Sequence, residues 1–492
     1  MTHTLTVLPH NFIFSVPHGS NLLDVLTQHG VFVPATCGGR SHCGKCAVRC
    51  RIADAEDYQT LLACHTSVQS DLTILLDTQT DETWDVSALS VNNGKNLGML
   101  LDIGTTTLAA CLIDKSSGEI LARASALNPQ GSFGADVLSR ISAFANGKGK
   151  QLRTAVVDAT NCLIAEFVST GAQIEELFVV GNPTMLHLFV GVDPAGIGSY
   201  PFTPAFVETK HFAGTEIGIH ATRVRLLPSI SAYLGSDVSA GILACEMHKT
   251  DKTQLFMDLG TNGEIVLAHQ GKLFAASTAA GPALEGANMS CGIGGVAGAV
   301  DRVWMENNRL RFTTVKNAPV RGICGSGFID LFALLLDEGI LDETGAFCDD
   351  GNSPLLHHLE DECFYLTPEV YLSQDDVRQF QLAKSAIAAG TKALLAHCNV
   401  SPEQVDRVFL AGGLGYYMSP ANASRTGLLS PALFPRTQIV GNTALSGARL
   451  CLIEQENQST LDAIAKQTET VELSFSAVFS QAYIENMGFD VD

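Results

Sequence analysis

Two stretches of the chain repeat one another: LGMLLDIGTTT at residues 97–107 and QLFMDLGTNGE at residues 254–264. In each stretch an apolar run ends in an acid and a small turn, and a second apolar run follows, which is typical of paired buried strands. Each copy also has a later helical pattern, at about residues 152–169 and 382–398, that leads into a further apolar strand. Because internal repetition indicates a duplicated structural unit, the sequence predicts two α/β lobes that face one another across a cleft.

The repeated turn has the composition of a loop that binds nucleotide phosphates. Asp102 and Asp258 end their apolar strands, so we expect their carboxylates in the cleft, where they hold Mg²⁺ through water or position the attacking nucleophile. Glycine after each acid lets the following N–H groups approach phosphate oxygens, and hydroxyl side chains add donors. The predicted nucleotide contacts of the two turns are Gly104, Thr105, Thr106, Thr107, Gly260, Thr261, Asn262 and Glu264. One such turn also occurs in plain hairpins, whereas two copies in register indicate a nucleotide site.

A glycine-rich turn late in the chain is a candidate for the adenosine end of this site. Residues 411–415 read AGGLG after an apolar strand, and Gly412, Gly413 and Gly415 would let adenosine lie against the backbone. The alternative interpretation is an ordinary turn between a strand and a helix.

Two further segments carry candidate nucleotide contacts, each with an alternative. Gly281 and Glu285 follow the third strand of the second copy, and Glu285 either contacts nucleotide or metal or is an acid at a helix N-terminus. Gly325 and Ser326 precede a helical run, which indicates a turn beside phosphate or ribose, or else tight helix packing. The neighbouring Cys324 is interpreted as a buried small thiol rather than a redox group.

The N-terminal segment has the cysteine spacing of an iron–sulfur protein. Cys37, Cys43 and Cys46 form a C-x5-C-x2-C loop, and Cys64 follows as the expected fourth ligand. This spacing indicates a [2Fe–2S] cluster; a structural zinc site is the alternative, although the second short knuckle typical of such sites is missing. Cys50 is a rival fourth ligand, and a lone cysteine on the strand that leaves the loop is the preferred interpretation. The hairpin pattern of residues 5–16, followed by a short helix at residues 21–29, is the β-grasp ferredoxin arrangement.

Composition excludes several functional classes. The 492 residues include 51 acids and 30 Lys or Arg, a net charge of −21, which argues against non-specific binding of nucleic acid or an anionic membrane. No apolar run is long enough to span a bilayer, and the first residues do not resemble a signal peptide, so we expect a cytoplasmic protein. The predicted organisation is a ferredoxin-like domain (1–86), a linker (87–96), a first lobe (97–250) and a second lobe with a C-terminal return (251–492).

The repeated turns and the late glycine loop resemble the ATPase superfamily of acetate and sugar kinases, Hsp70 and actin. Six segments resemble, more narrowly, the RACo-like reductive activators of corrinoid proteins, which include activating enzymes of O-demethylases. These segments are GNPTMLHLFVG (181–191), PSISAYLGSDVSAGILA (228–244), DLGTNGEIVL (258–267), STAAGPALEGANMSCGIGGVAGAV (277–300), GICGSGFID (322–330) and GNTALSGA (441–448). The resemblance implies a β-grasp [2Fe–2S] domain followed by a duplicated actin-like, RNase H-like ATPase body.

The resemblance also implies a function in anaerobic methyl transfer. Such an activator uses ATP and Mg²⁺ to pass one electron from its [2Fe–2S] cluster to cob(II)alamin on a corrinoid protein, restoring cob(I)alamin. It implies an external low-potential electron donor and is consistent with a homodimer. Because plant-type clusters have potentials near −400 mV and protein-bound cob(II)alamin is harder to reduce, ATP is expected to shift the axial ligation of the docked corrinoid and raise its potential.

Two other classes of function stay open at this point: a small-molecule kinase with a regulatory iron–sulfur domain, and a non-catalytic module whose body only holds a partner. Four further residues have structural interpretations. Asn182 is expected to line the cleft, Asp136 and Arg140 to form a surface ion pair, and His187 to be a core histidine with satisfied hydrogen bonds rather than a corrinoid ligand.

Overall fold

The chain divides into two compact units, each of which we describe by itself. Unit 1 comprises residues 1–206 and 210–226, and unit 2 comprises residues 207–209 and 227–492. The computed structural model describes residues 2–8, 12–29, 31, 33, 35, 46–52, 55, 57–75, 96–168, 173–412 and 418–490. The predicted linker lies outside the described residues except for Asn96, and the predicted domain bounds and the cleft stay predictions.

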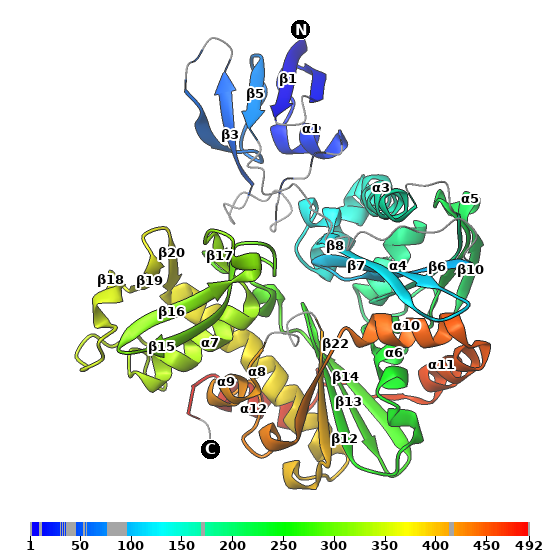
Figure 1. Cartoon of the computed structure of the whole chain (residues 1–492), viewed down its shortest axis with the longest axis vertical. Coiled ribbons are helices and arrows are strands. Elements are labelled where there is room, and N and C mark those ends of the chain that lie inside the picture. Colours follow the sequence, from blue (N-terminus) through cyan, green and yellow to red (C-terminus); the bar gives the residue numbers. More distant parts are fainter. Residues whose placement is uncertain are drawn as a thin grey trace. The chain divides into compact units, whose positions relative to one another are not determined.

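The N-terminal part of unit 1 is a small five-stranded sheet with one helix (Figure 1). The strand order is β2-β1-β5-β3-β4, in which β1 and β2 form the predicted antiparallel hairpin. Its elements are β1 (Thr2–Leu8), β2 (Phe12–Pro17), α1 (Leu22–Gln28), β3 (Ala47–Ile52), β4 (Gln59–Leu62) and β5 (Leu72–Leu75). Alternate residues of β1, among them Leu5 and Val7, are fully buried, while Asn21 caps α1 by accepting from the N–H of Asp24. The expected hairpin and helix are confirmed.

The rest of unit 1 is built on a six-stranded sheet of order β10-β11-β9-β6-β7-β8. Strands β6, β7 and β8 are antiparallel neighbours, and β6 pairs with β9 in parallel. Helices α3 and α4 lie beside these strands (Figure 1), and they contribute apolar side chains to the same core. The elements are β6 (Leu97–Ile103), β7 (Thr107–Asp114), β8 (Ile120–Leu127), α2 (Val137–Ala143), α3 (Gly149–Phe167), β9 (Ile174–Gly181), α4 (Pro183–Val190), β10 (Lys210–Ala213), α5 (Gly214–Ile217) and β11 (Ala221–Leu226).

Unit 2 repeats the same order of strands. Its main sheet has the order β22-β21-β12-β13-β14-β23, with β12, β13 and β14 antiparallel and β12 parallel to β21. The members of this sheet are β12 (Gln254–Leu259), β13 (Gly263–His269), β14 (Lys272–Thr278), β21 (Arg407–Ala411), β22 (Thr437–Gly441) and β23 (Glu469–Thr470). The four strands β9-β6-β7-β8 therefore correspond to β21-β12-β13-β14, which confirms the duplicated α/β fold.

Unit 2 also carries two three-stranded sheets and several helices (Figure 1). These elements contribute buried side chains to a large apolar core. The strands are β15 (Ala299–Glu306), β16 (Arg309–Thr314), β17 (Gly322–Ile323), β18 (Leu359–Glu360), β19 (Cys363–Thr367) and β20 (Val370–Ser373). The helices are α6 (Ser236–Ala244), α7 (Gly325–Asp337), α8 (Gln374–His397), α9 (Pro420–Arg425), α10 (Thr443–Ile453), α11 (Gln455–Gln467) and α12 (Ala477–Glu485).

Helix α8 begins earlier than the apolar pattern predicted. We expected its start near Leu382, but it starts at Gln374 because Ser373 and Asp376 form a capping box there. Among the described residues, no helix combines the length and the apolar character that crossing a bilayer requires.

Candidate functional site

The first predicted phosphate loop joins β6 to β7 in unit 1. Asp102 lies near the carboxyl end of β6, where it pairs with Ala109 on β7 and Val180 on β9. Glycine is required at position 104, because a Cβ there would lie 2.6 Å from the carbonyl oxygen of Thr107. The loop therefore turns as the sequence predicted, with Thr105 buried beneath it at 6% exposure.

Three side chains from other elements hold this loop in place. The amide of Asn182, which caps α4, donates to Thr105 Oγ1 at 3.1 Å, and the amide of Asn128 donates to the carbonyl of Gly104 at 2.8 Å. The guanidinium of Arg140 donates to the carbonyl of Thr105. Sequence patterns do not reveal Asn128 or Arg140 in this role, since both contacts depend on tertiary packing.

The prediction of a surface ion pair between Asp136 and Arg140 is wrong. Asp136 caps α2 by accepting from the N–H of Ser139 at 2.7 Å, while Arg140 is only 1% exposed. The Nε of Arg140 donates to the carbonyl of Gly134 at 3.0 Å, and its Nη1 lies 3.4 Å from Oε1 of Gln130. The four-residue spacing is the same in a surface pair and in this arrangement, so only the packing of α2 distinguishes them.

The second predicted phosphate loop joins β12 to β13 in unit 2. Thr261, 5% exposed, donates its hydroxyl to Oε2 of Glu285 at 2.8 Å. Glu285 ends a short 3-10 turn (Pro282–Glu285) that follows Gly281, whose φ is 75°. The structure thus brings Glu285 and the turn of Gly260 to Asn262 together, an arrangement that the linear spacing of these residues did not reveal.

Carboxylates gather at the carboxyl end of β12. Asp258 pairs with Glu264 across β12 and β13, and Asp237 comes from the first turn of α6. Burial, and then the charges of Asp237 and Asp258, hold the pKa of Glu264 well above its ordinary value. Burial raises the pKa of Asp237 to about 6, although the N–H of Val238 donates to its Oδ1 at 2.8 Å. Asp237 was missed in the sequence because it lies on a helix 21 residues before Asp258.

Gly412, the first glycine after β21, approaches Asp258. Gly412 has a φ of 94°, and a Cβ there would lie 2.5 Å from Oδ1 of Asp258 and 2.7 Å from the carbonyl oxygen of Leu259. Only glycine fits this position, because both the positive φ and the close approach exclude a side chain. Gly413 and Gly415, the other predicted adenosine contacts, lie outside the described residues.

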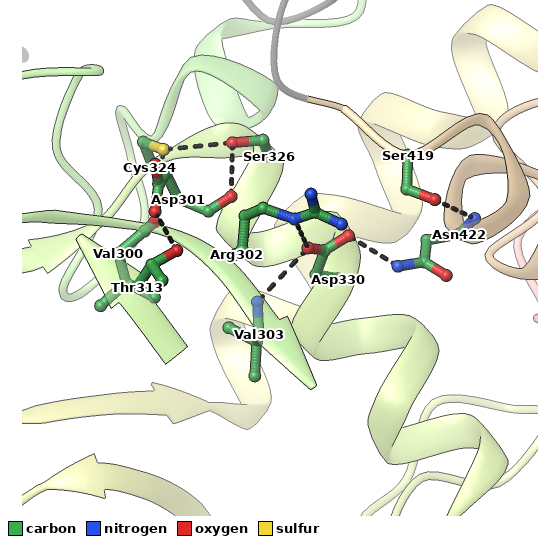
Figure 2. A network of polar contacts seen from close by, with 10 residues as sticks. All are labelled: Val300, Asp301, Arg302, Val303, Thr313, Cys324, Ser326, Asp330, Ser419 and Asn422. Carbon is green, nitrogen blue, oxygen red and sulfur yellow. Dashed lines mark hydrogen bonds and ion pairs between the residues drawn. The ribbon is translucent and has the colours of Figure 1, made fainter. Parts of the chain in front are cut away.

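The turn before α7 is tightly packed. Ser326 is 3% exposed and donates to the carbonyl of Asp301 at 2.9 Å, and a Cβ on Gly327 would lie 2.2 Å from the carbonyl oxygen of Val300. Burial raises the pKa of the Cys324 thiol, which lies 3.4 Å from the hydroxyl of Ser326 (Figure 2). Cys324 is therefore a buried thiol as expected, and the packing interpretation accounts for Ser326; the nucleotide contacts of Gly325 and Ser326 stay a prediction.

A buried carboxylate connects α7 to the helix that follows the glycine-rich turn. Asp330 on α7 accepts from Asn422 on α9 at 2.6 Å and from the N–H of Val303 at 3.3 Å, and Arg302 lies 3.9 Å from it (Figure 2). Burial raises the pKa of Asp330 despite these partners. This bond joins α9, which begins at Pro420, to α7.

Two of the four predicted cluster cysteines are described, and they converge. Sγ of Cys46 lies 3.2 Å from Sγ of Cys64, close enough for both to bind one metal atom, and the amide of Asn21 donates to the carbonyl of Cys64 at 2.8 Å. Cys37 and Cys43 lie outside the described residues. Cys50 points into the core of the small sheet at 1% exposure, and burial raises its pKa to about 11, as suits a structural cysteine rather than a ligand.

His187 is the core histidine that the sequence predicted. It is fully buried, its Nδ1 lies 2.7 Å from the carbonyl of Pro183, and its Nε2 accepts from the N–H of Ala205 at 3.1 Å. Burial lowers the pKa of His187 and so favours the neutral imidazole. Both ring nitrogens of this imidazole take part in structural hydrogen bonds.

Comparisons with known proteins agree on one family. Three family profiles match: "C-terminal domain of RACo the ASKHA domain" at residues 252–491, "RACo middle region" at 97–250 and "2Fe-2S iron-sulfur cluster binding domain" at 5–69. The chain is 32% identical over 420 residues to corrinoid activation enzyme RamQ of Eubacterium limosum. This alignment covers 80% of this chain and 70% of the relative. It is 24% identical over 437 residues to the [Co(II) methylated amine-specific corrinoid protein] reductase of Methanosarcina barkeri, covering 80% and 77%.

One solved structure is similar over nearly the whole length. It is described as "Reductive activator for corrinoid,iron-sulfur protein", is 26% identical, and aligns with a TM-score of 0.75 over 99% of this chain and 98% of that one. The likeness therefore extends across both the small ferredoxin-like sheet and the duplicated body.

Proposed function

This chain belongs to the RACo family of corrinoid-protein activators, and we propose that it restores cob(I)alamin on a corrinoid methyl-carrier protein by ATP-dependent one-electron reduction. The observation that carries this proposal is the union, in one chain, of a ferredoxin-type sheet with converging cysteines and a duplicated body with two D-x-G-T turns. The relatives named as activators and reductases of corrinoid proteins support it.

The cluster site is proposed to hold [2Fe–2S] through Cys37, Cys43, Cys46 and Cys64. The 3.2 Å separation of the two described sulfurs fits ligands of one iron. When bound, such a cluster accepts and donates one electron at a potential near −400 mV. Asn21 fixes the turn of Cys64 through its carbonyl, and the raised pKa of Cys50 keeps that thiol protonated.

The nucleotide is proposed to bind at the two repeated turns as MgATP. The N–H groups and hydroxyls of residues 104–107 and 260–262 would face phosphate oxygens, and Asp102 and Asp258 would hold Mg²⁺ through water. Support comes from the raised pKa values of Asp237 and Glu264. Burial disfavours the ionised form of both carboxyls, and the charges of Asp237 and Asp258 add to this at Glu264, so a cation nearby would stabilise the ionised forms. Gly412 supports the adenosine assignment because its lack of a side chain lets the backbone after β21 approach Asp258 of the second turn closely.

ATP is needed in this proposal because the electron transfer is uphill. For a one-electron step, each ~59 mV of unfavourable potential lowers the equilibrium constant tenfold. Nucleotide binding would favour an arrangement of the docked corrinoid that is easier to reduce, and the shift is limited by the difference in nucleotide affinity between the two arrangements. An external low-potential electron donor, a homodimer and a cytoplasmic location belong to the same proposal.

The deciding experiment is anaerobic. The purified protein is mixed with a cob(II)-loaded corrinoid methyl-carrier protein and a reductant, with and without MgATP, and the visible spectrum is followed. We expect cob(I) to appear only with MgATP, and Asp102→Ala to abolish the reaction while leaving the cluster spectrum intact.

Two results would overturn the proposal. If Asp102→Ala reduces cob(II)alamin at the wild-type rate, the first predicted phosphate loop is not needed to couple ATP to the electron transfer. Absence of cob(I) with several carrier proteins, together with ATP consumption stimulated by a small metabolite, would identify a kinase instead.

A further inference from the structure

Unit 2 presents a β-hairpin whose inner face is fixed to the core. Strands β15 and β16 are joined by Asn307 and Asn308, whose φ values of 51° and 58° are those of a tight two-residue hairpin turn. Val303 is 4% exposed, and Met305, Leu310 and Phe312 pack against the large core. Beyond the bulge between Val300 and Arg302, side chains alternate along each strand, so Arg302, Trp304 and Glu306 on β15 and Arg309 and Arg311 on β16 face outward.

The outward face is aromatic and basic. Trp304, 40% exposed, lies directly opposite Arg311 in the antiparallel register, and Arg309 lies opposite Glu306. The side chains of Arg302 and Arg311 are 63% and 48% exposed. We call the outward residues Arg302, Trp304, Glu306, Arg309 and Arg311 the Trp304 ribbon. Nε of Arg311 lies 3.4 Å from Oε2 of Glu306, so the three arginines and this one acid give the ribbon a net charge of +2.

The charge of this segment is opposite to that of the chain. Residues 299–321 contain five bases and two acids, a net charge of +3, whereas the whole chain has a net charge of −21. Charged side chains on an edge strand such as β16 also hinder aggregation, but acids would do this as well as arginines. Protection of the edge therefore does not explain why an acidic chain has arginines here. Tryptophan and arginine side by side are instead the residue types that dominate binding energy at protein interfaces.

Polar contacts make the hairpin a fixed platform. Thr313 donates to Oδ1 of Asp301 at 2.7 Å, and the carbonyl of Asp301 accepts from Ser326 on α7 (Figure 2). Asp330 accepts from the N–H of Val303 and lies 3.9 Å from Arg302. A platform that is already ordered loses little conformational entropy when a partner binds.

From these observations we infer that the Trp304 ribbon is the surface on which unit 2 docks a carboxylate-rich face of the corrinoid protein, an inference that rests on the proposed function. We choose this partner surface because a carboxylate-rich face is complementary in charge to the basic ribbon. The chain as a whole has a net charge of −21, so attraction of such a face to the ribbon both steers the encounter and fixes its orientation. Trp304 then supplies apolar contact at the centre.

The ribbon is also connected to α9, the helix that follows the glycine-rich turn in the chain. Arg302 lies 3.9 Å from Asp330, which accepts from Asn422 on that helix. A partner docked on the ribbon would therefore act on a side chain that also contacts α9.

The test uses the full chain with its cluster and compares Trp304→Ala and Arg309→Gln/Arg311→Gln with the control Lys249→Gln/Lys392→Gln. The control removes two cations of the same unit whose side chains are 62% and 58% exposed. The readout is the KM for a cob(II)-loaded corrinoid protein in MgATP-dependent cob(I) formation. We expect Trp304→Ala to raise KM roughly tenfold, and the double arginine variant to raise KM and flatten its dependence on salt. The cluster spectrum and the affinity for MgATP should stay at wild-type values.

The outcomes separate this inference from the proposed function. If wild-type protein forms cob(I) and the ribbon variants keep its KM, or if the control raises KM equally, the docking surface is refuted while the function stands. If wild-type protein forms no cob(I), the function fails, and direct binding of the same corrinoid protein to wild type and variants decides on the ribbon alone.

Discussion

Arg140 offers the sharpest test of how the first phosphate loop is held. Its guanidinium, 1% exposed, donates to the carbonyls of Thr105 and Gly134. Arg140→Met leaves both buried acceptors without this donor, at a cost of about 1–3 kcal/mol each. The variant also no longer has to move a charged guanidinium from water into the protein interior when it folds, which offsets part of that loss. We therefore expect a decrease of about 2–4 kcal/mol in the free energy of unfolding.

The same substitution should weaken nucleotide binding. Without Arg140 the loop keeps its bonds to Asn128 and Asn182 but loses the one to the carbonyl of Thr105, so the ligand must order about two residues, at on the order of 1 kcal/mol per residue. This corresponds to a rise of about 30-fold in the Kd for MgATP. Urea unfolding gives the first quantity, and titration calorimetry of the folded variant gives the second.

Lys384→Met is the matched control for this experiment. Lys384 is likewise a buried cation, 1% exposed, that donates to a backbone carbonyl, that of Gly488. It lies on α8 near the C-terminal segment, so its loss should lower stability without changing the Kd for MgATP. If Arg140→Met loses stability but binds MgATP with wild-type affinity, Arg140 serves folding alone and the reasoning about the loop is wrong.

Three further predictions follow from single contacts. Cys64→Ala should remove the cluster whereas Cys50→Ala keeps it, as measured by iron and sulfide content and the visible spectrum. Asp330→Asn should lower the free energy of unfolding by about 1–3 kcal/mol, against less than about 1 kcal/mol for Asp337→Asn at the exposed contact between α7 and α9; urea titrations of both variants check this. Burial lowers the pKa of Lys384 from 10.5 to about 8, so the unfolded chain binds more protons between these values and stability rises with pH there, by up to ~1.4 kcal/mol per unit. That rise should be absent from Lys384→Met when both proteins are unfolded across pH 8 to 10.

Much of the fold could be predicted because it is written in local patterns. The apolar runs before Asp102 and Asp258 have the period and length of buried strands, and their repetition indicated the duplication that the two sheets confirm. The spacing of the cysteines likewise located Cys46 and Cys64, whose sulfurs converge. Such signals depend on neighbours in the chain, so no knowledge of the folded arrangement is needed to recognise them.

The surroundings of the candidate site depended instead on contacts between distant residues. Arg140 has the spacing of a surface ion pair, yet burial of α2 turns it toward the loop at Thr105. Asp237 has the pattern of a helix start, and only the packing of α6 brings its charge to Glu264.

The Trp304 ribbon shows the same division between local and long-range information. Alternation along β15 and β16 places successive side chains on opposite faces, but it does not say which face is buried. Packing of Phe312 and its neighbours against the core settles that, and it leaves Trp304 and Arg311 side by side on the outside. Local periodicity therefore accounts for the elements, whereas burial, charge neighbours and cross-strand partners arise only when the chain has folded.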